Sequence, residues 1–461
     1  MTVTDQALAA AEAGFDAATA RWMAWLRIPS VSAQPVHDGD CAAAARFCAA
    51  DLESLGFQVT IRQTQGQPVV VAHHPGPGGD AAHLLYYGHY DVQPAEPLEL
   101  WSSPPFEPTL VQGPHGARVV ARGAVDDKGQ VSMWLAAFRA WHDATGGLPV
   151  RITAVIEGEE EIGSPHLEAF VASHADELRA DAVVISDTGM WDIDTPALTT
   201  SLRGMVYMEV ILRGPSRDLH SGSFGGSALN PINALTAALG QLRDKAGRIR
   251  LAGFYDGIAD VSPEQAAQWD GLGFSEARFL GEIGLHAAVG EVDRHPLERL
   301  WSRPTCDING IWGGYQGPGS KTVIPAEAGA KVSFRLVPGQ DPARVAEAFR
   351  AFMTAQVPGD ARLEFKEFSS APGIEVATES RFVTAAMEAM GDEFGRPAVM
   401  IGCGGSIPVV ESFRRVLGID SLLMGFGLND DQTHGPNEKF EVACFRRGMR
   451  SHVRLLGKLA R

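Results

Sequence analysis

The sequence of 461 residues is poor in cysteine, has no long apolar run and carries no excess of positive charge. Its five cysteines are scattered without a C-x-x-C pair, which argues against a disulfide framework and favours reduced thiols in a cytoplasmic protein. No run approaches the roughly 18 apolar residues of a membrane span. The segment before Arg21 lacks the basic residues of a signal peptide. The net charge of −17 argues against nucleic acid or a membrane surface as the main partner.

Apolar residues make up 45% of the chain, which is enough for more than one core. Their spacing predicts helices over 5–27 and 40–55. Short apolar runs then alternate with helical stretches, which is typical of an α/β domain with a mainly parallel central sheet. The expected strands are 83–92, 117–125, 150–158 and 181–187, and the expected helices are 129–144 and 165–178.

The pattern changes after residue 204, where strands with one exposed face are expected. The alternating runs are 205–214, 329–339 and 361–368, the helical runs are 230–244 and 341–353, and 251–320 is irregular. The α/β pattern of the first 204 residues returns near the end of the chain, with a helix expected over 381–394 and a buried strand over 421–427. The sequence therefore predicts a discontinuous α/β domain, 1–204 plus 380–461, and a smaller α+β domain inserted at 205–379.

Polar side chains follow the expected α/β strands at the points where these strands end. They are His89 and Asp91, Asp126 and Asp127, Glu159 to Glu161, Asp187, and the group of Asp430, Asp431 and His434. Ligands bind beyond the carboxyl ends of strands in open α/β sheets, so we expect five strands to deliver these groups to one sheet edge.

Each group alone has an ordinary explanation, such as a helix N-cap for Asp126 and Asp127 or a solvated turn for the three glutamates. Together they would repel one another unless cations lay among them. Histidines and carboxylates without cysteine suit zinc, manganese or cobalt in a catalytic site. More than four candidates suggest two ions that share a bridging carboxylate.

Short motifs occur in a fixed order along almost the whole chain. They are H-Y-D-V-Q-P (89–94), R-G-A-V-D-D-K-G (122–129), E-G-E-E-E-I-G-S (157–164), S-D-T (186–188), D-L-H-S-G (218–222), K-T-V-I-P (321–325), F-R-L-V-P (334–338), G-G-S-I-P (404–408) and T-H-G-P-N-E (433–438). In this order and context they resemble the M20 metallopeptidases, and most of all the cytosolic nonspecific dipeptidase and carnosinase branch. A lone H-x-D would carry no such weight.

The resemblance implies a dipeptidase with two divalent ions, zinc in the first place and manganese or cobalt as alternatives. Its catalytic domain would be the discontinuous α/β domain, and the inserted domain would serve as a lid and in dimerisation. His89, Asp126 and Asp187 would hold one ion. Asp126, Glu161 and His434 would hold the other, with Asp126 bridging.

Two further acidic residues receive catalytic roles from the resemblance. Asp91 would hydrogen-bond His89 and fix its tautomer. Glu160 would be the general base that activates a water shared by the two ions. Because three glutamates follow one another, the motif can also be aligned one residue away. In that alignment the general base and the metal ligand would be exchanged.

The substrate contacts also come from the resemblance. His220 would stabilise the oxyanion and bind substrate, reaching the active site of the partner subunit in a homodimer. Arg335 would bind the substrate's C-terminal carboxylate, and Thr322, Ser406 and His434 would make further substrate contacts. The segment T-C-D-I-N-G-I-W (305–312) departs from the animal enzymes of this branch, so it leaves the side-chain preference of the pocket open.

Two other functions compete with the dipeptidase. An N-acyl-amino-acid deacylase or related amidohydrolase would share the metal site and differ in its substrate pocket. A catalytically inactive metal-binding or interaction protein would keep only the scaffold. The presence of Asp91 and Glu160 counts against the inactive protein, because a purely structural metal site needs neither.

Overall fold

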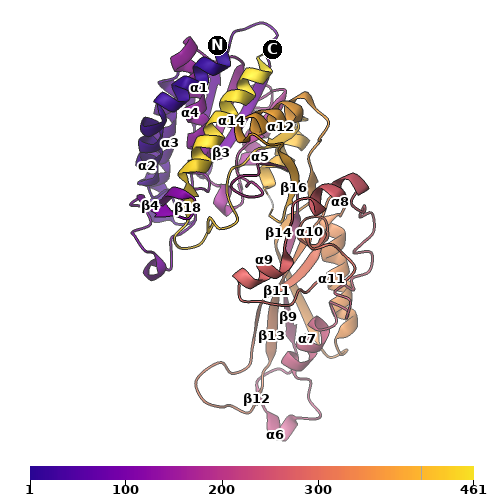
Figure 1. Ribbon diagram of the computed structural model, residues 1–461. Helices are drawn as coiled ribbons and strands as arrows, with labels where there is room; N and C mark the ends of the chain where they lie inside the picture. Colours follow the sequence, from indigo (N-terminus) through magenta and orange to yellow (C-terminus); the bar gives the residue numbers. More distant parts are fainter. Residues whose placement is uncertain (406, 461) are drawn as a thin grey trace. The chain divides into compact units, whose positions relative to one another are not determined.

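The computed structural model describes residues 1–405 and 407–460, which form two compact units (Figure 1). The first unit comprises Met1–Thr200, Val376–Ile401 and Pro408–Arg461, and the second comprises Ser201–Glu375 and Gly402–Ile407. The limits expected for the inserted domain, 205–379, stay a prediction. No sequence pattern indicates that the short segment 402–407 joins the second unit.

The first unit is built on a mixed sheet with nine strands among the described residues. Four central strands run parallel, and the strands on both flanks pair antiparallel. The order is β1 (Gln58–Arg62), β2 (Val69–His74), β6 (Arg151–Glu157), β3 (His83–His89), β7 (Ala182–Ile185), β17 (Ser421–Leu423), β8 (Ala197–Leu202) and β15 (Ile374–Glu375), with β16 (Val399–Cys403) paired to β8. The predicted α/β fold class is confirmed, with a parallel centre and antiparallel flanks.

Helices cover both faces of this sheet, so its central strands are continuous apolar runs. On one face, the Tyr86 ring packs at 5.3 Å from Trp134 and 4.9 Å from Phe138. On the other face, its neighbour Tyr87 packs at 5.5 Å from Phe413. The helices of this unit are α1 (Val3–Ala13), α2 (Phe15–Leu26), α3 (Asp38–Glu53), α4 (Lys128–Thr145), α5 (Leu167–Ser173), α12 (Arg381–Phe394), α13 (Pro408–Ser412) and α14 (Val442–Leu459).

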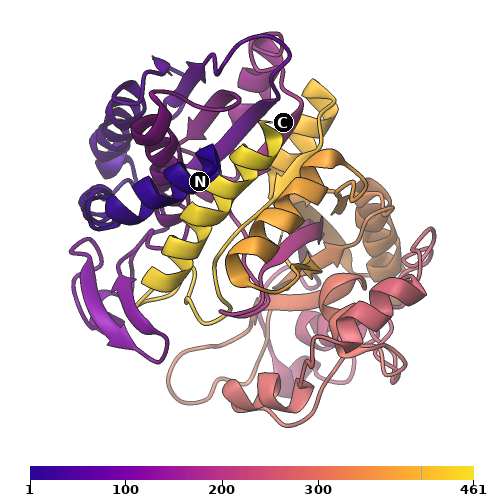
Figure 2. The same ribbon diagram turned by 45° about the horizontal axis from the view of Figure 1, so that its top comes forward.

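The first and last helices of the chain pack together, as Figures 1 and 2 show for α1 and α14. The single helix expected over 5–27 is instead two helices that meet at Gly14. Glycine is a poor residue for a helix interior, and here its N–H closes the last turn of α1 on Ala10 O. Among the described residues, no helix is both long enough and apolar enough to cross a bilayer.

The strand expected over 117–125 is shorter and belongs to a separate sheet. β5 (Gly116–Val120) pairs with β4 (Thr109–Gly113) and β18 (Lys439–Glu441). Asp126 therefore enters the site from the turn before α4, and the expectation of five strands in one sheet is wrong for this segment. An apolar run indicates that a strand is buried, but it does not indicate which strands it pairs with.

The second unit is a four-stranded antiparallel sheet with helices packed on one face. Buried and half-buried residues alternate along β13, where Val332 and Phe334 face the core and Lys331 and Ser333 do not. The order is β11 (Thr305–Gly313), β13 (Glu327–Leu336), β9 (Gly204–Arg213) and β14 (Arg362–Ala371). Helices α7 (Pro231–Leu239) and α11 (Pro342–Gln356) cover the core face.

The segment 251–320 contains more regular structure than its sequence suggested. It holds α8 (Pro263–Asp270), α9 (Glu276–Glu282), α10 (Pro296–Trp301) and the edge strand β11. A bulge between Ile308 and Gly310 interrupts the alternation along β11, which explains why the strand was missed. A small ribbon joins β10 (Leu219–His220) to β12 (Val323–Ile324), and α6 (Ser221–Phe224) follows β10.

One buried histidine makes the fold sensitive to acid. His452 on α14 is fully buried between the hydroxyls of Tyr86 and Ser186, each 3.1 Å from a ring nitrogen. Burial lowers its pKa from 6.5 to about 3. Below pH 6.5 the unfolded chain therefore binds a proton at this histidine, whereas the folded chain does not until the pH reaches about 3. The free energy of unfolding should fall as the pH drops through this range.

When the pH is lowered from 7 to 4, we expect the free energy of unfolding to fall by about 3 kcal/mol less in His452→Gln than in wild type. Urea unfolding at both pH values, with a chelator present throughout, would measure the difference. His115→Gln replaces an exposed histidine and should keep the wild-type dependence. An equal loss in His452→Gln and wild type would contradict the assignment.

Candidate active site

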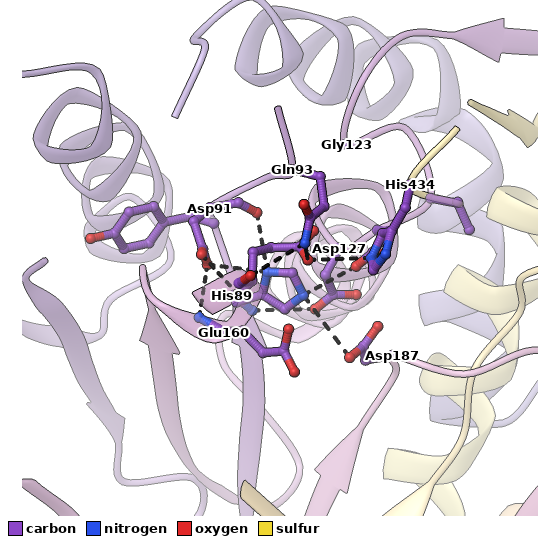
Figure 3. A network of polar contacts seen from close by, with 12 residues as sticks. His89, Asp91, Gln93, Gly123, Asp127, Glu160, Asp187 and His434 are labelled. Atoms are coloured by element: carbon purple, nitrogen blue, oxygen red, sulfur yellow. Dashed lines mark hydrogen bonds and ion pairs between the residues drawn. The ribbon is translucent and has the colours of Figure 1, made fainter. Parts of the chain in front are cut away.

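His89 ends β3 and is completely buried. Its Nδ1 lies 3.1 Å from the backbone oxygen of Asp91 and 3.3 Å from Asp91 Oδ1. Its Nε2 lies 3.2 Å from Asp126 Oδ1. It also lies 4.0 Å from Oδ2 of Asp187, which is labelled beside it in Figure 3. This Nε2 has no well-aligned hydrogen bond among the described residues, although it faces two carboxylates. A metal ligand histidine has this form, with one nitrogen oriented by the protein and the other left for the ion.

Asp126 lies between His89 and a second imidazole. Its Oδ2 is 2.9 Å from His434 Nε2, which is 3.3 Å from Glu161 Oε2. Two triplets result, one of His89, Asp126 and Asp187 and one of Asp126, Glu161 and His434. Within each triplet the possible ligand atoms all lie within 4.8 Å of one another. Asp126 belongs to both triplets, so it would bridge two ions if each triplet held one.

The central strands bring most of these residues to one edge of the sheet. β6, β3, β7 and β17 are parallel neighbours, so their carboxyl ends lie side by side. His89 ends β3, Asp187 follows β7, and His434 lies in the loop after β17. Glu161 lies in the short helical turn after β6.

Asp91 is fully buried and holds two parts of the site at once. Its carboxylate accepts hydrogen bonds from Ser32 Oγ at 2.6 Å, Glu160 N at 3.2 Å and Glu161 N at 3.1 Å. The same carboxylate contacts His89 Nδ1. Asp91 thus orients the imidazole and fixes the backbone of the turn that carries both glutamates.

Glu160 belongs to neither triplet, and no hydrogen bond reaches its carboxylate among the described residues. Burial raises its pKa to about 8, and the nearby carboxylates of Asp126 and Glu161 add to the shift. Burial also raises the pKa of Glu161 and of Asp187. Such crowded carboxylates resist ionisation in the protein alone, and divalent cations would remove the repulsion.

Glu438 is a structural residue of the site that the sequence did not single out. It is fully buried, and its carboxylate accepts hydrogen bonds from the backbone N–H groups of Gly123, Val125 and Asp126 at 2.9 to 3.1 Å. Arg122 Nη1 donates a further bond at 2.7 Å. Glu438 therefore shapes the turn that presents Asp126. Its place in the T-H-G-P-N-E motif indicated that it lies near the site. The sequence alone does not distinguish a carboxylate that binds backbone N–H groups from one that binds metal.

Gln93 and Asp127 also support the site. Asp127 was expected at this edge but given no role, and Gln93 was not singled out. Gln93 Nε2 donates to Glu161 Oε2 at 2.8 Å and to the Glu161 backbone oxygen at 3.2 Å. Asp127 Oδ2 accepts from the His89 backbone N–H at 3.3 Å. Both lie inside motifs that carry ligands, and neither has a residue type that marks such a role.

His220 and Thr322 lie together in the second unit. Both are exposed, and the register of the β10–β12 ribbon pairs His220 with Val323, the residue after Thr322. His220 Nδ1 accepts a hydrogen bond from Gly222 N at 3.0 Å, which orients the ring. The roles expected for both residues in substrate binding stay predictions.

Arg335 lies half-buried on β13 near a second arginine. Arg203 Nε donates to Gly404 O at 3.2 Å. Burial, and then the charge of Arg335, lowers the pKa of Arg203 to about 10. Among the described residues, no acidic side chain forms an ion pair with Arg335, and its role in substrate binding stays a prediction. Ser406, the other expected substrate contact, lies outside the described residues.

Comparisons with known proteins agree with this arrangement. A model of peptidase family M20/M25/M40 matches residues 85–458. The Cys-Gly metallodipeptidase dug1 of Schizosaccharomyces pombe is 31% identical over 447 residues, which cover 94% of this chain and 93% of the relative. The Beta-Ala-His dipeptidase of Rattus norvegicus is 31% identical over 400 residues, covering 86% and 80%. A solved structure of the di-peptidase Dug1p from Saccharomyces cerevisiae matches with a TM-score of 0.84 and 27% identity, covering 100% of this chain and 99% of that chain.

Proposed function

Because the chain belongs to peptidase family M20/M25/M40, we propose that it is a broad-specificity dipeptidase that hydrolyses dipeptides with divalent metal ions. One observation carries the proposal. Two triplets of possible ligands share Asp126, and beside them lies the carboxylate of Glu160, which accepts no hydrogen bond from the part of the chain that the structure describes. The dipeptidase relatives support dipeptides as the substrate class.

Two ions per subunit are proposed, with zinc as the native metal and manganese or cobalt as alternatives. His89 and Asp187 would hold one, Glu161 and His434 the other, and Asp126 would bridge them. The donor set supports this choice, since it contains imidazoles and carboxylates without thiolates. When bound, such ions would polarise the scissile carbonyl and acidify water.

Glu160 would move the proton in the reaction. Its carboxylate would take a proton from the attacking water and pass it to the leaving amine. Asp91 would act through other groups, because its oxygens hold the His89 ring and the backbone of the glutamate turn. The assignment of Glu160 as base and Glu161 as ligand rests on the triplet that contains Glu161 and excludes Glu160.

The second unit would supply the remaining contacts. Arg335 would bind the substrate carboxylate through its guanidinium fork. His220 would donate to the oxyanion in the active site of the partner subunit of a homodimer. Thr322, Ser406 and His434 would also contact the substrate. A cytoplasmic location is part of the proposal, supported by five cysteines that are all free thiols.

A substrate panel separates this function from the N-acyl-amino-acid deacylase, which the dipeptidase relatives do not favour. Purified enzyme would be given dipeptides and the matching acetyl and succinyl amino acids. We expect kcat/KM for the dipeptides to exceed that for the acylated compounds by at least tenfold. Cleavage of the acylated compounds alone would refute the proposal.

Removing the metal should abolish activity and reduce stability. Dialysis against a chelator would leave the carboxylates of Asp126, Glu161 and Asp187 to repel one another, so we expect dipeptide hydrolysis to fall to background and Tm to drop by several degrees. Adding zinc, manganese or cobalt singly should restore both, and the best ion can be compared with elemental analysis of the untreated protein. Full activity at less than a tenth of the original metal content would contradict the metal site.

A further inference from the structure

Glu159 is the first of the three consecutive glutamates, and it belongs to neither metal triplet. Its side chain is nevertheless buried, with 5% of the residue exposed. One carboxylate oxygen lies 2.8 Å from Nδ1 of His166, which is about two-thirds buried. A methionine or leucine of similar size could fill this position at a lower desolvation cost, so filling space does not explain a carboxylate here.

The backbone around Glu159 forms the turn that presents Glu160 and Glu161. The Glu159 carbonyl accepts hydrogen bonds from Ile162 N at 3.2 Å and Ser164 N at 2.8 Å. Asp91 holds the N–H groups of Glu160 and Glu161 from one side. The hydrogen bond between Glu159 and His166 ties the turn to the start of α5 on the other side.

A third segment lies against the Glu159 carboxylate. A Cβ at Gly66 would come within 1.8 Å of Glu159 Oε1 and 2.6 Å of its Cδ. Gly66 belongs to the loop between β1 and β2, and its N–H donates to Thr64 Oγ1 at 2.9 Å. The same loop is fixed at Pro68, whose carbonyl accepts from the Tyr90 hydroxyl at 2.6 Å. Glu159 is thus confined between this loop and His166.

The two functional glutamates depend on the turn to different degrees. Gln93 holds Glu161 through both its carboxylate and its backbone oxygen. Glu160 has no such side-chain support among the described residues, so the direction of its carboxylate is set by the turn itself. Loosening the turn should therefore misplace Glu160 and leave Glu161 in position.

We propose that Glu159, paired with His166 and confined by Gly66, is a positioning residue that fixes the turn presenting the Glu160 carboxylate. The proposal rests on the proposed function, because its effect is exerted on Glu160 as general base. It predicts that loss of the pair lowers kcat while KM and metal content stay unchanged.

The first test compares Glu159→Ala, His166→Ala and Glu159→Gln. We expect each alanine variant to lose about tenfold in kcat, with KM within twofold and the metal content of wild type. The double alanine variant should lose no more than the worse single variant, since both remove one interaction. Glu159→Gln can still accept from Nδ1 and should keep kcat within threefold of wild type. Additive losses, or kcat within twofold of wild type in Glu159→Ala, would overturn the proposal.

The second test uses Gly66→Ala, which adds a methyl group against the carboxylate. It should lower kcat about as much as Glu159→Ala does, but it should have no further effect in the Glu159→Ala background, where the methyl group has room. Gly39→Ala is the control, because a Cβ at this exposed helical position meets nothing within 4 Å. Equal losses from Gly66→Ala in both backgrounds would overturn the proposed confinement.

The assays also separate this proposal from the proposed function. Circular dichroism and activity at a temperature well below Tm exclude loss of folding as the cause. A wild-type protein that cleaves no dipeptide would refute the dipeptidase itself. A wild type that cleaves dipeptides, together with a Glu159→Ala variant of equal kcat, would refute the positioning role alone.

Discussion

Replacing Glu160 by glutamine should lower kcat for dipeptides by about a thousandfold and leave the metal content unchanged. Glu160 lies outside both triplets, so its loss removes no ligand. Glutamine keeps the size of the side chain but cannot take a proton from water. Steady-state kinetics on the best dipeptide, together with elemental analysis of the same preparation, would measure both effects.

Glu161→Gln provides the matched comparison, because it lies one residue away in the same turn. It should lose metal as well as activity, and excess metal should restore part of the activity, whereas excess metal should not help Glu160→Gln. Glu53→Gln, an exposed surface change, should resemble wild type. If Glu160→Gln lost metal while Glu161→Gln kept it, the base and the ligand would be exchanged. Near-wild-type turnover in Glu160→Gln would refute the base assignment.

Much of the α/β unit could be predicted because its strands are buried on both faces. The interiors of β3 and β6 are mostly apolar and are buried, and each strand ends on a polar residue, His89 or Glu157. The same rule misled for residues 117–125. The apolar sequence made β5 look like a member of the central sheet, although only its last two residues, Val119 and Val120, are buried. Its pairing is set by hydrogen bonds to β4 and β18, and no local pattern encodes these partners.

The residues of the site also fall into two groups: those that a local sequence pattern predicts, and those that only the folded structure identifies. His89 and Asp187 could be proposed as a group because each lies at or just after the carboxyl end of an apolar strand, and carboxyl ends of parallel strands meet at one edge of a sheet. Glu438 and Gln93 could not, since their partners are backbone groups and a carboxylate contributed by distant segments. In the sequence, the extra Glu159 left open which of the glutamates is the ligand and which is the base. In the structure, the Glu159 carboxylate contacts His166, and Glu161 is the glutamate that belongs to a triplet.

A heterodimer of two inactive variants should recover about half of the wild-type activity per dimer if His220 acts across the subunit interface. His220→Ala removes the proposed oxyanion donor, and we expect it to lose at least a hundredfold in kcat with its metal retained. Asp126→Ala removes the residue common to both triplets and should bind little metal. In the mixed dimer, the metal site of the His220→Ala chain would receive the intact His220 of the Asp126→Ala chain.

Co-expression with two different affinity tags would isolate the mixed dimer, and its activity would be compared with each parent homodimer. A dimer that combines Asp126→Ala with Glu160→Gln is the matched control, because each of its metal sites carries one lesion and should stay inactive. An active monomer, or a mixed dimer no more active than its parents, would show that each chain completes its own site. If activity is recovered only in the mixed dimer that contains His220→Ala, His220 and Asp126 must act in the same reaction from different chains.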